Sequence, residues 1–492
     1  MPIYSNGVEV MNSGQPHVIV IMADQLRFDA LGGPHTPHLN QLARESVTFE
    51  RAYCASPLCV PARGAFFTGR YPNSTGCLIN PWEPADAEHG RVKAGIANLF
   101  GLLENEWDSW NVGKQHFLTE EQIHLRAESK TRWQAGMQDY KRFLKEHGKR
   151  MPGGPSFKGL TPELAGGRVT RAKYYSIPTT GRYEEGFDFF FDGYFAQAAV
   201  EAIRSRDRAK PMLLNAMFLA PHPPFDVPEP WFSAVREAAL PDNVGEWYPG
   251  QSPLQLYNMT GALGARYTRA EWAEIWKVYL GLTALLDHCV GMIIGELKRQ
   301  GMYDDALIVF TSDHGEMLGS HRLWQKTCMY EEAVRTPLFF KLPAADGISP
   351  AVRDVPVSAV DVLPTLCDRL GIPVPEGAAG RSLLPVIRNG GTLGPRPVFI
   401  QSDGNGARGH FQRCVLDGHY KLIVDLFKDE TYFELYASGD EGEKNNLAFD
   451  PAHAETVRGM LRTLQEHMAA THDLLRIPDG SFDRFLTDYG KS

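Results

Sequence analysis

Three stretches of the chain are almost entirely apolar, and each ends on a residue that can take part in chemistry. They are HVIVIMAD (17–24), PMLLNAMFLAPH (211–222) and ALIVFTSD (306–313). Continuous apolar and β-branched runs of this length are typical of parallel strands buried on both faces. Helical periodicity lies between them, in HLNQLARES, in YFAQAAVEAIRSR and in a long segment from about 269 to 300. This alternation predicts an α/β fold in which helices sandwich a large, mostly parallel or mixed central sheet.

From about residue 395 the pattern changes to short alternating strands separated by turn residues. These are RPVFIQSDG, QRCVLDGHYKLIVDL and TYFELYAS, and the helical segment HAETVRGMLRTLQEHMAATHDLL and a short tail follow them. The pattern is typical of an antiparallel meander with a covering helix. We therefore predict an α/β domain over residues 1–394 and a smaller C-terminal α+β subdomain, with an antiparallel sheet, over residues 395–492.

One stretch of the first domain, residues 121–180, differs in composition from its surroundings. It is rich in Gly and Pro and carries 12 Lys or Arg against 5 Asp or Glu. Two interpretations stay open: a solvated insertion, or a lid that meets an anionic substrate.

The bulk composition excludes several classes of protein. The 492 residues are 43% apolar, and the net charge of −9 argues against nucleic-acid binding, which depends on a basic footprint. It does not exclude a small anionic substrate, because the local field of a cleft matters more than the total charge. Seven cysteines without regular spacing do not form a disulfide framework. With no signal-peptide pattern and no apolar stretch that stands out as long enough to span a bilayer, we expect a cytoplasmic protein without a membrane partner.

Carboxylates stand at the ends of two predicted strands. Ligands of α/β sheets gather beyond the carboxyl ends of the strands, where Asp24, His222 and Asp313 lie. Asp24 is followed by Gln25 and Asp313 by His314, which together make a plausible site for a divalent cation. Each Asp alone would fit a helix cap better than a metal ligand, but the pair at equivalent strand ends favours a metal.

Four basic side chains stand in loops between these segments. They are Lys114 and His116 in NVGKQHF, His222 in APHPPF and Lys326 in LWQKT. A single loop Lys or His is usually solvated. If all four converge near a divalent cation, they would neutralise an oxyanion with two charges, such as sulfate or phosphate.

The cysteine Cys59 stands in the pentapeptide Cys59-Val60-Pro61-Ala62-Arg63, followed by GAFFTGR. Cys54 lacks this pattern because Leu58 stands where the arginine should be, and the other five cysteines lack it too. The C-x-P-x-R sequence resembles the signature of the type I sulfatases of the alkaline phosphatase superfamily, in which a formylglycine-generating enzyme oxidises this cysteine to the aldehyde formylglycine. The order of IVIMADQLRFDALG, TPHLNQLA, GKQHF, APHPPF, VFTSDHGEMLG, WQK and ELYASGDEGEKNNLA is also similar to that family.

The resemblance implies roles for individual residues. A divalent cation, most often Ca²⁺ and sometimes Mg²⁺ or Mn²⁺, would be held by Asp24, Gln25, Asp313, His314 and the modified Cys59. Arg63 and Lys114 would hold the formylglycine and its charge, and His116 would act on its second hydroxyl. His222 and Lys326 would bind the sulfate and the leaving group. Many relatives have Asp at the position of Gln25 and Asn at that of His314, which would change the charge of the cation site.

The implied reaction explains the need for an aldehyde. Its hydrate carries two hydroxyls: one attacks sulfur to give a covalent sulfated enzyme, and loss of the proton from the other releases sulfate. The expected activity is hydrolysis of a sulfate monoester of choline, an aryl alcohol or a carbohydrate. A phosphonate monoester or phosphodiester hydrolase is the alternative, disfavoured by Lys114 and His116, and a non-catalytic sulfatase-like binding protein is a third reading.

Overall fold

A computed structural model of the chain describes residues 14–81, 88–165, 168–391, 393–394, 396–406 and 408–490. An eight-stranded sheet with strand order β13-β2-β12-β11-β1-β9-β4-β5 lies at its centre. The strand β1 pairs in parallel with β11 on one side and with β9 on the other, and β12 runs antiparallel to both of its neighbours. The strands are β1 (His17–Asp24), β2 (Val47–Phe49), β4 (Asp108–Gly113), β5 (Arg132–Gln134), β9 (Met212–Pro221), β11 (Ala306–Ser312), β12 (Leu338–Lys341) and β13 (Ala351–Arg353).

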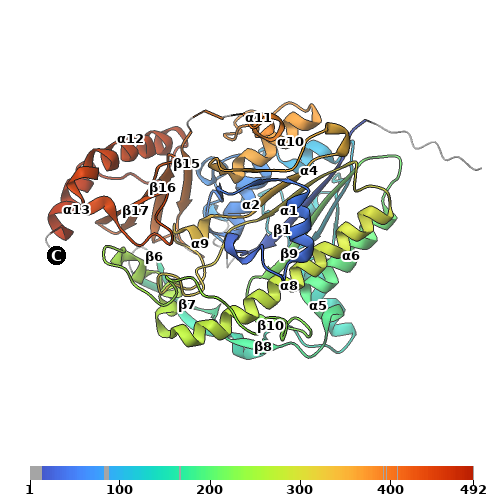
Figure 1. The fold of residues 1–492 in the computed structure, drawn as a ribbon, viewed down its shortest axis with the longest axis horizontal. Helices are drawn as coiled ribbons and strands as arrows, with labels where there is room; N and C mark the ends of the chain where they lie inside the picture. Colours follow the sequence, from blue (N-terminus) through green and yellow to red (C-terminus); the bar gives the residue numbers. More distant parts are fainter. Residues whose placement is uncertain are drawn as a thin grey trace, which may run out of the picture.

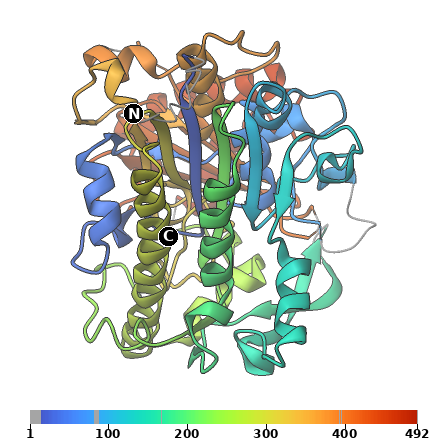
Figure 2. The ribbon, with the colours of Figure 1, turned by 90° about the vertical axis from the view of Figure 1, so that its right-hand side faces the viewer.

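Helices cover both faces of this sheet (Figures 1 and 2). Because side chains of a strand alternate between faces, Ile19 and Ile21 enter one hydrophobic cluster while Val18 and Val20 enter the other. The first cluster contains residues of α1 (Pro37–Arg44), α6 (Phe191–Ser205) and α8 (Arg269–Arg299). The second contains residues of α2 (Cys59–Thr68), α4 (Leu99–Leu103), α10 (Val362–Leu370) and α11 (Leu384–Asn389). The predicted α/β sandwich is confirmed.

The helix α8 is the longest described element. It is long and apolar enough to cross a membrane by length and composition, yet 67% of its apolar window is buried inside the protein. It begins with a capping box in which Thr268 and Glu271 satisfy each other's backbone N–H groups. It packs lengthwise beside α6 (Figure 2), so its apolar residues serve the core of the layered fold.

The C-terminal subdomain lies to one side of the central sheet (Figure 1). Its antiparallel sheet is β15 (Val398–Ser402), β16 (Phe411–Leu416), β17 (Tyr420–Phe427) and β18 (Glu430–Ala437), as the sequence predicts. The helix α12 (Ala454–Ala470) ends before Leu475, and a further helix, α13 (Ser481–Tyr489), forms in the expected tail. Phe482 and Phe485 of α13 pack on Phe433, which anchors this helix to the sheet. The proposed boundary at residue 395 lies outside the described residues, as do residues 1–13, on which the signal-peptide expectation partly rests.

The basic stretch 121–180 is only partly an insertion. The strand β5 pairs with β4 at the edge of the central sheet, and α5 (Met137–Glu146) buries Tyr140 and Leu144 in the core. The stretch leaves the core later, as a hairpin of β6 (Lys158–Ala165) and β7 (Arg168–Ser176), whose residues 166–167 are outside the described residues. Tyr140 and Leu144 are apolar side chains at helical spacing, and their burial places α5 against the core although the segment is basic.

Candidate active site

Two buried carboxylates meet where β1 and β11 end. Asp24 is fully buried and Asp313 nearly so, and the backbone N–H of Gln25 donates to Asp313 Oδ1 at 3.1 Å. The two oxygens of each carboxylate have different partners. Asp24 Oδ2 accepts from Arg63 Nη2 at 3.0 Å and from Lys114 Nζ, and Asp313 Oδ2 accepts from Arg63 Nε at 3.0 Å. The two Oδ1 atoms therefore remain directed toward a shared space.

The helix α2 brings Cys59 and Arg63 to this space. Cys59 is the first helical residue, and Arg63 lies about one turn later on the same buried helix. Pro61 falls in the first turn, where its missing N–H has no intrahelical partner to lose. Arg63 Nη1 also donates to the carbonyl oxygen of Lys114 at 3.0 Å, so this one guanidinium ties together β1, β4, β11 and α2.

The geometry of a cation site is present at the cysteine. One ligand atom from each of Asp24, Cys59, Asp313 and His314 lies within 4.8 Å of all the others. His314 Nε2 is 3.2 Å from Cys59 Sγ, while His314 Nδ1 lies 2.9 Å from the carbonyl of Gly315. A proton on Nδ1 would bond that carbonyl and leave the Nε2 lone pair facing the cluster. Two carboxylates and an imidazole are a donor set that fits a divalent cation.

Gln25, the fifth predicted ligand, is held by a residue that sequence analysis missed. Its backbone has φ 66°, and its amide nitrogen donates to Glu316 Oε2 while its amide oxygen accepts from Lys326. A carboxylate only accepts, so Glu316 selects the amide orientation that directs the Gln25 oxygen toward Lys326. Glu316 is fully buried, and burial raises its pKa. Its position in SDHGEMLG, directly after His314 and Gly315, was the available signal.

Both predicted lysines reach the site and are buried. Lys114 follows β4, and its Nζ lies 3.9 Å from Cys59 Sγ as well as on Asp24. Burial lowers the pKa of Lys114, but the neighbouring Asp24, Cys59 and Asp313 together outweigh it, and the net shift is upward. Lys326 donates to the amide oxygen of Gln25, and it lies on a loop where Gln325 has φ 65°. Two ammonium groups therefore face the cysteine region.

The two predicted histidines enter the site as neutral groups. His222 Nε2 lies 3.9 Å from Asp24 Oδ1, and its Nδ1 lies 2.6 Å from the carbonyl of Pro223. Burial, followed by the charges of Lys326 and Lys114, holds the pKa of His222 well below its ordinary value. Burial and Lys114 do the same to the pKa of half-buried His116, whose Nδ1 has no hydrogen-bond partner among the described residues. Sequence analysis counted four cations, and in the folded chain two of the four are neutral imidazoles suited to proton transfer.

Cys59 differs from the other six cysteines in its electrostatics. All seven are free and buried. Burial and Asp24 oppose ionisation of Cys59, but Lys114, Lys326 and His314 outweigh them and lower the pKa of its thiol. Burial raises the pKa of Cys54 and of Cys77, Cys289, Cys328, Cys367 and Cys414. The reactive position is therefore Cys59.

Comparison with known families agrees with this arrangement. Residues 16–372, well over half of the chain, match the family model described as sulfatase. The chain belongs to the sulfatase family. Residues 319–470 also match the model described as N-sulphoglucosamine sulphohydrolase, C-terminal, which covers β15 to β18 and α12. The protein is thus a sulfatase-family hydrolase.

Individual relatives of this sulfatase carry several activities in their names. It is 29% identical to the choline-sulfatase of Rhizobium meliloti (strain 1021) over 478 residues, which cover 90% of this chain and 84% of the relative. It is 27% identical to the multifunctional alkaline phosphatase superfamily protein PehA of Trinickia caryophylli, covering 90% and 93%. The crystal structure of the phosphonate monoester hydrolase of Agrobacterium radiobacter superposes with a TM-score of 0.75 at 22% identity, covering 93% of this chain and 96% of that one. At this identity, the similarity to the phosphonate monoester hydrolase shows a shared fold and nothing about activity.

Proposed function

We propose that this sulfatase hydrolyses a sulfate monoester to an alcohol and inorganic sulfate, with Cys59 converted to formylglycine and with one divalent cation, which the family resemblance indicates is Ca²⁺. Asp24, Asp313 and His314 would hold the cation together with the modified Cys59, and Gln25, whose amide oxygen accepts from Lys326, would complete the set. The cation would supply positive charge that favours ionisation of a bound hydroxyl. The hydrated aldehyde would supply two hydroxyls on one carbon, one to attack sulfur and one to allow release of sulfate.

The chain's own residues divide the remaining work. Lys114 and Lys326 face the cysteine region with two fixed positive charges, which would stabilise the charge that grows on the transferring sulfuryl group. Neutral His222 turns an unprotonated Nε2 toward Asp24; it would accept the proton of the attacking hydroxyl and pass it to the leaving alkoxide, which becomes the alcohol. Neutral His116 would take the proton from the second hydroxyl. Arg63 would keep both carboxylates in place throughout.

The observation that carries the proposal is the surroundings of Cys59. It is the first residue of a buried helix, beside two carboxylates, an imidazole and two lysines, and its thiol alone among the seven has a lowered pKa. A structural cysteine in a hydrophobic core has no use for these neighbours.

The alternative activity is hydrolysis of phosphonate monoesters or phosphodiesters; two solved proteins of this fold are named phosphonate monoester hydrolases. Lys114 and His116 both enter the site, and this pair favours sulfate esters. A substrate panel separates the two. We expect choline sulfate, an aryl sulfate or a carbohydrate sulfate to be turned over at least about 100-fold faster than a phenylphosphonate monoester, as judged by kcat/KM.

Maturation is tested on the chain produced together with a formylglycine-generating enzyme. Mass spectrometry of the peptide that spans Cys54 to Arg63 should find the aldehyde at position 59 and a thiol at position 54. Cys59→Ser should release at most one equivalent of alcohol per chain and then stop, because serine has no second hydroxyl. Cys54→Ser, the matched control, should stay active. A fully active preparation with an unmodified thiol at Cys59 would overturn the proposal.

A further inference from the structure

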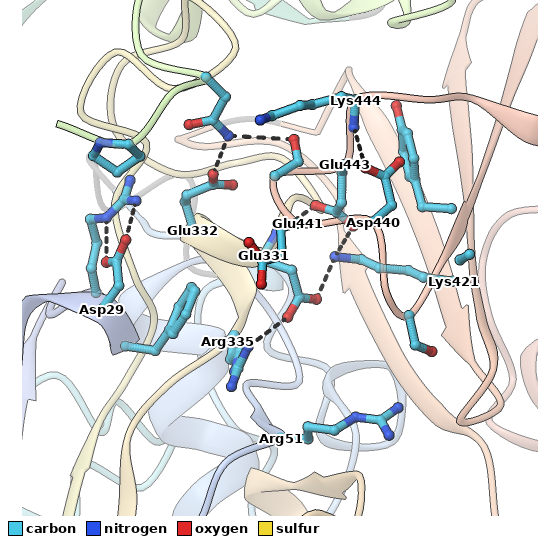
Figure 3. Close-up of a pocket in the computed structure, with 18 of the residues that line it drawn as sticks. Asp29, Arg51, Glu331, Glu332, Arg335, Lys421, Asp440, Glu441, Glu443 and Lys444 are labelled. Atoms are coloured by element: carbon cyan, nitrogen blue, oxygen red, sulfur yellow. Dashed lines mark hydrogen bonds and ion pairs between the residues drawn. The ribbon is translucent and has the colours of Figure 1, made fainter.

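A cavity of about 540 Å³ lies between the catalytic domain and the C-terminal subdomain (Figure 3). One wall is built from the turn after β1, residues 240–243 and α9 (Glu331–Val334), and the other from β17 and the turn after β18. Seven acidic side chains line it against five basic ones, and none of the candidate active-site residues does. It is large enough for a small ligand or a hydrated ion.

The basic groups of this cavity already have acidic partners. Lys421 Nζ bridges Glu331 Oε1 at 3.0 Å and Glu443 Oε1 at 2.8 Å (Figure 3). Arg27 binds Asp29 through two nitrogens at 2.7 and 2.8 Å, and its third nitrogen donates to backbone carbonyls. The short ion pairs of these cations are therefore made with other carboxylates than the remaining one.

That carboxylate is Glu332. The residue is 4% exposed, and among the described residues no basic side chain forms an ion pair with it. Its Oε1 accepts from Asn243 Nδ2 at 2.5 Å, while its Oε2 has no hydrogen-bond partner in the part of the chain that is described. Asn243 is 2% exposed, and its Oδ1 likewise lacks a partner there. The Arg27 guanidinium is near enough for its charge to act on Glu332, but it donates no hydrogen bond to either of these two oxygens. Burying polar oxygens without partners is costly, so a positively charged group belongs beside them.

The chemistry of the cavity favours a hydrated divalent cation over other positive groups. Glu331 and Glu443 share Lys421, with Arg335 3.8 Å from Glu331 at the exposed side. Burial raises the pKa of Glu443 to about 8, with the charges of Glu331 and Glu332 adding to the rise and the charge of Lys421 opposing it. The free protein atoms are oxygens, the ligands of hard cations. Because Glu332 and Asn243 each offer one buried oxygen that lacks a partner among the described residues, the ion would keep most of its waters, as Mg²⁺ commonly does.

We propose that this interdomain cavity binds a hydrated divalent cation, separate from the catalytic one, through Glu332 and Asn243. The site adjoins the catalytic loop through the backbone. The Glu316 N–H donates to the Glu332 carbonyl at 2.8 Å, and the Gly315 N–H donates to the Ala333 carbonyl at 2.8 Å. An ion bound to Glu332 would thus stabilise the position of α9 and of the loop that carries His314, and would hold both against the C-terminal subdomain. This inference stands on contacts that do not depend on the proposed function.

The test counts bound ions. Chains are stripped with a chelator, dialysed against millimolar Mg²⁺ and analysed for metal per chain. We expect two ions in the wild type, one in Asp313→Ala, one in Glu332→Gln and none in the double variant. In the Asp313→Ala background, Mg²⁺ should raise Tm by about 1–3 °C, and Glu332→Gln should abolish that rise.

Asp242→Asn is the matched control, because Asp242 lines the same cavity with its side chain 88% exposed and should leave the count unchanged. If Glu332→Gln does not fold, the metal content of the Asp313→Ala chain still tests the proposal, because the interdomain cavity of that chain is intact. An Asp313→Ala chain that binds no Mg²⁺ would overturn the proposal, and water would then fill the cavity. A rise in Tm with 1,4-diaminobutane but none with Mg²⁺ would overturn it in favour of an organic ammonium ligand.

Discussion

Replacing Arg63 with methionine removes the one side chain that binds both strand-end carboxylates. Its guanidinium is 1% exposed and donates to Asp24 Oδ2, Asp313 Oδ2 and the Lys114 carbonyl, each at 3.0 Å. Methionine fills much of the same volume but supplies no donor. Loss of one partner from a buried ion pair typically costs about 3–5 kcal/mol, because the other charge stays buried. We expect a loss of about that size in metal-free buffer.

The same variant should respond more strongly to a divalent cation. Without the guanidinium charge beside the two carboxylates, an ion in the site meets less repulsion, and Ca²⁺ should bind at least about tenfold tighter, a further gain of about 1.4 kcal/mol at saturation. Urea unfolding with chelator and with saturating Ca²⁺ measures both quantities on the same chains.

A second buried arginine provides the control. Arg413, 2% exposed, binds Asp473 at 2.6 Å and Asp403 at 3.2 Å in the C-terminal subdomain. Arg413→Met should destabilise the chain to a similar extent but gain no more from Ca²⁺ than the wild type. The reasoning would be refuted if Arg63→Met were as stable as the wild type in chelator, or if both variants gained equally from Ca²⁺.

Three further outcomes are expected. Glu316→Gln should fold yet lower kcat/KM about tenfold and weaken Ca²⁺ binding in a titration of the stripped chain, because an amide at position 316 can donate as well as accept and no longer selects one orientation of the Gln25 amide; unchanged Ca²⁺ affinity would contradict this role. Lys326→Met should lower kcat/KM by about two to four orders of magnitude, or about 3–5 kcal/mol, in steady-state assays, and near-normal kinetics would place its loop outside the reaction. His467, stacked on Phe399 at 3.7 Å, has its pKa lowered by burial from 6.5 to about 4. The unfolded chain therefore takes up this proton first, and as pH falls from about 6.5 to 4 the folded chain should lose about 3 kcal/mol that His467→Phe does not lose, measured by urea unfolding across that range; an identical pH profile in both chains would exclude the assignment.

Strand ends and the cysteine motif could be read without a structure because their signals are local. A run such as HVIVIMAD is apolar on both faces, so it predicts a central strand, and the residue after it must emerge at the edge of the sheet. In the structure Asp24 and Asp313 do emerge together, and the C-x-P-x-R turn places Cys59 and Arg63 beside them.

Other features lay beyond local patterns. The segment with β5 and α5 has the composition of a solvated insertion, and its place at the sheet edge depends on pairing with β4. The helix α13 forms because Phe482 and Phe485 find Phe433, a partner some fifty residues earlier. Neither contact has a signature within the segment itself.

By itself the sequence determined the layered α/β fold, the antiparallel C-terminal sheet and which residues gather at the strand ends, because periodicity and motif spacing are properties of neighbouring residues. Only the tertiary structure decided the charges and orientations: burial and nearby lysines keep the pKa of His116 and His222 low, Glu316 orients Gln25, and buried Glu332 has no ion-pair partner among the described residues. Protonation and hydrogen-bond direction depend on burial and on charges contributed by distant segments, whose distances are set only when the chain has folded.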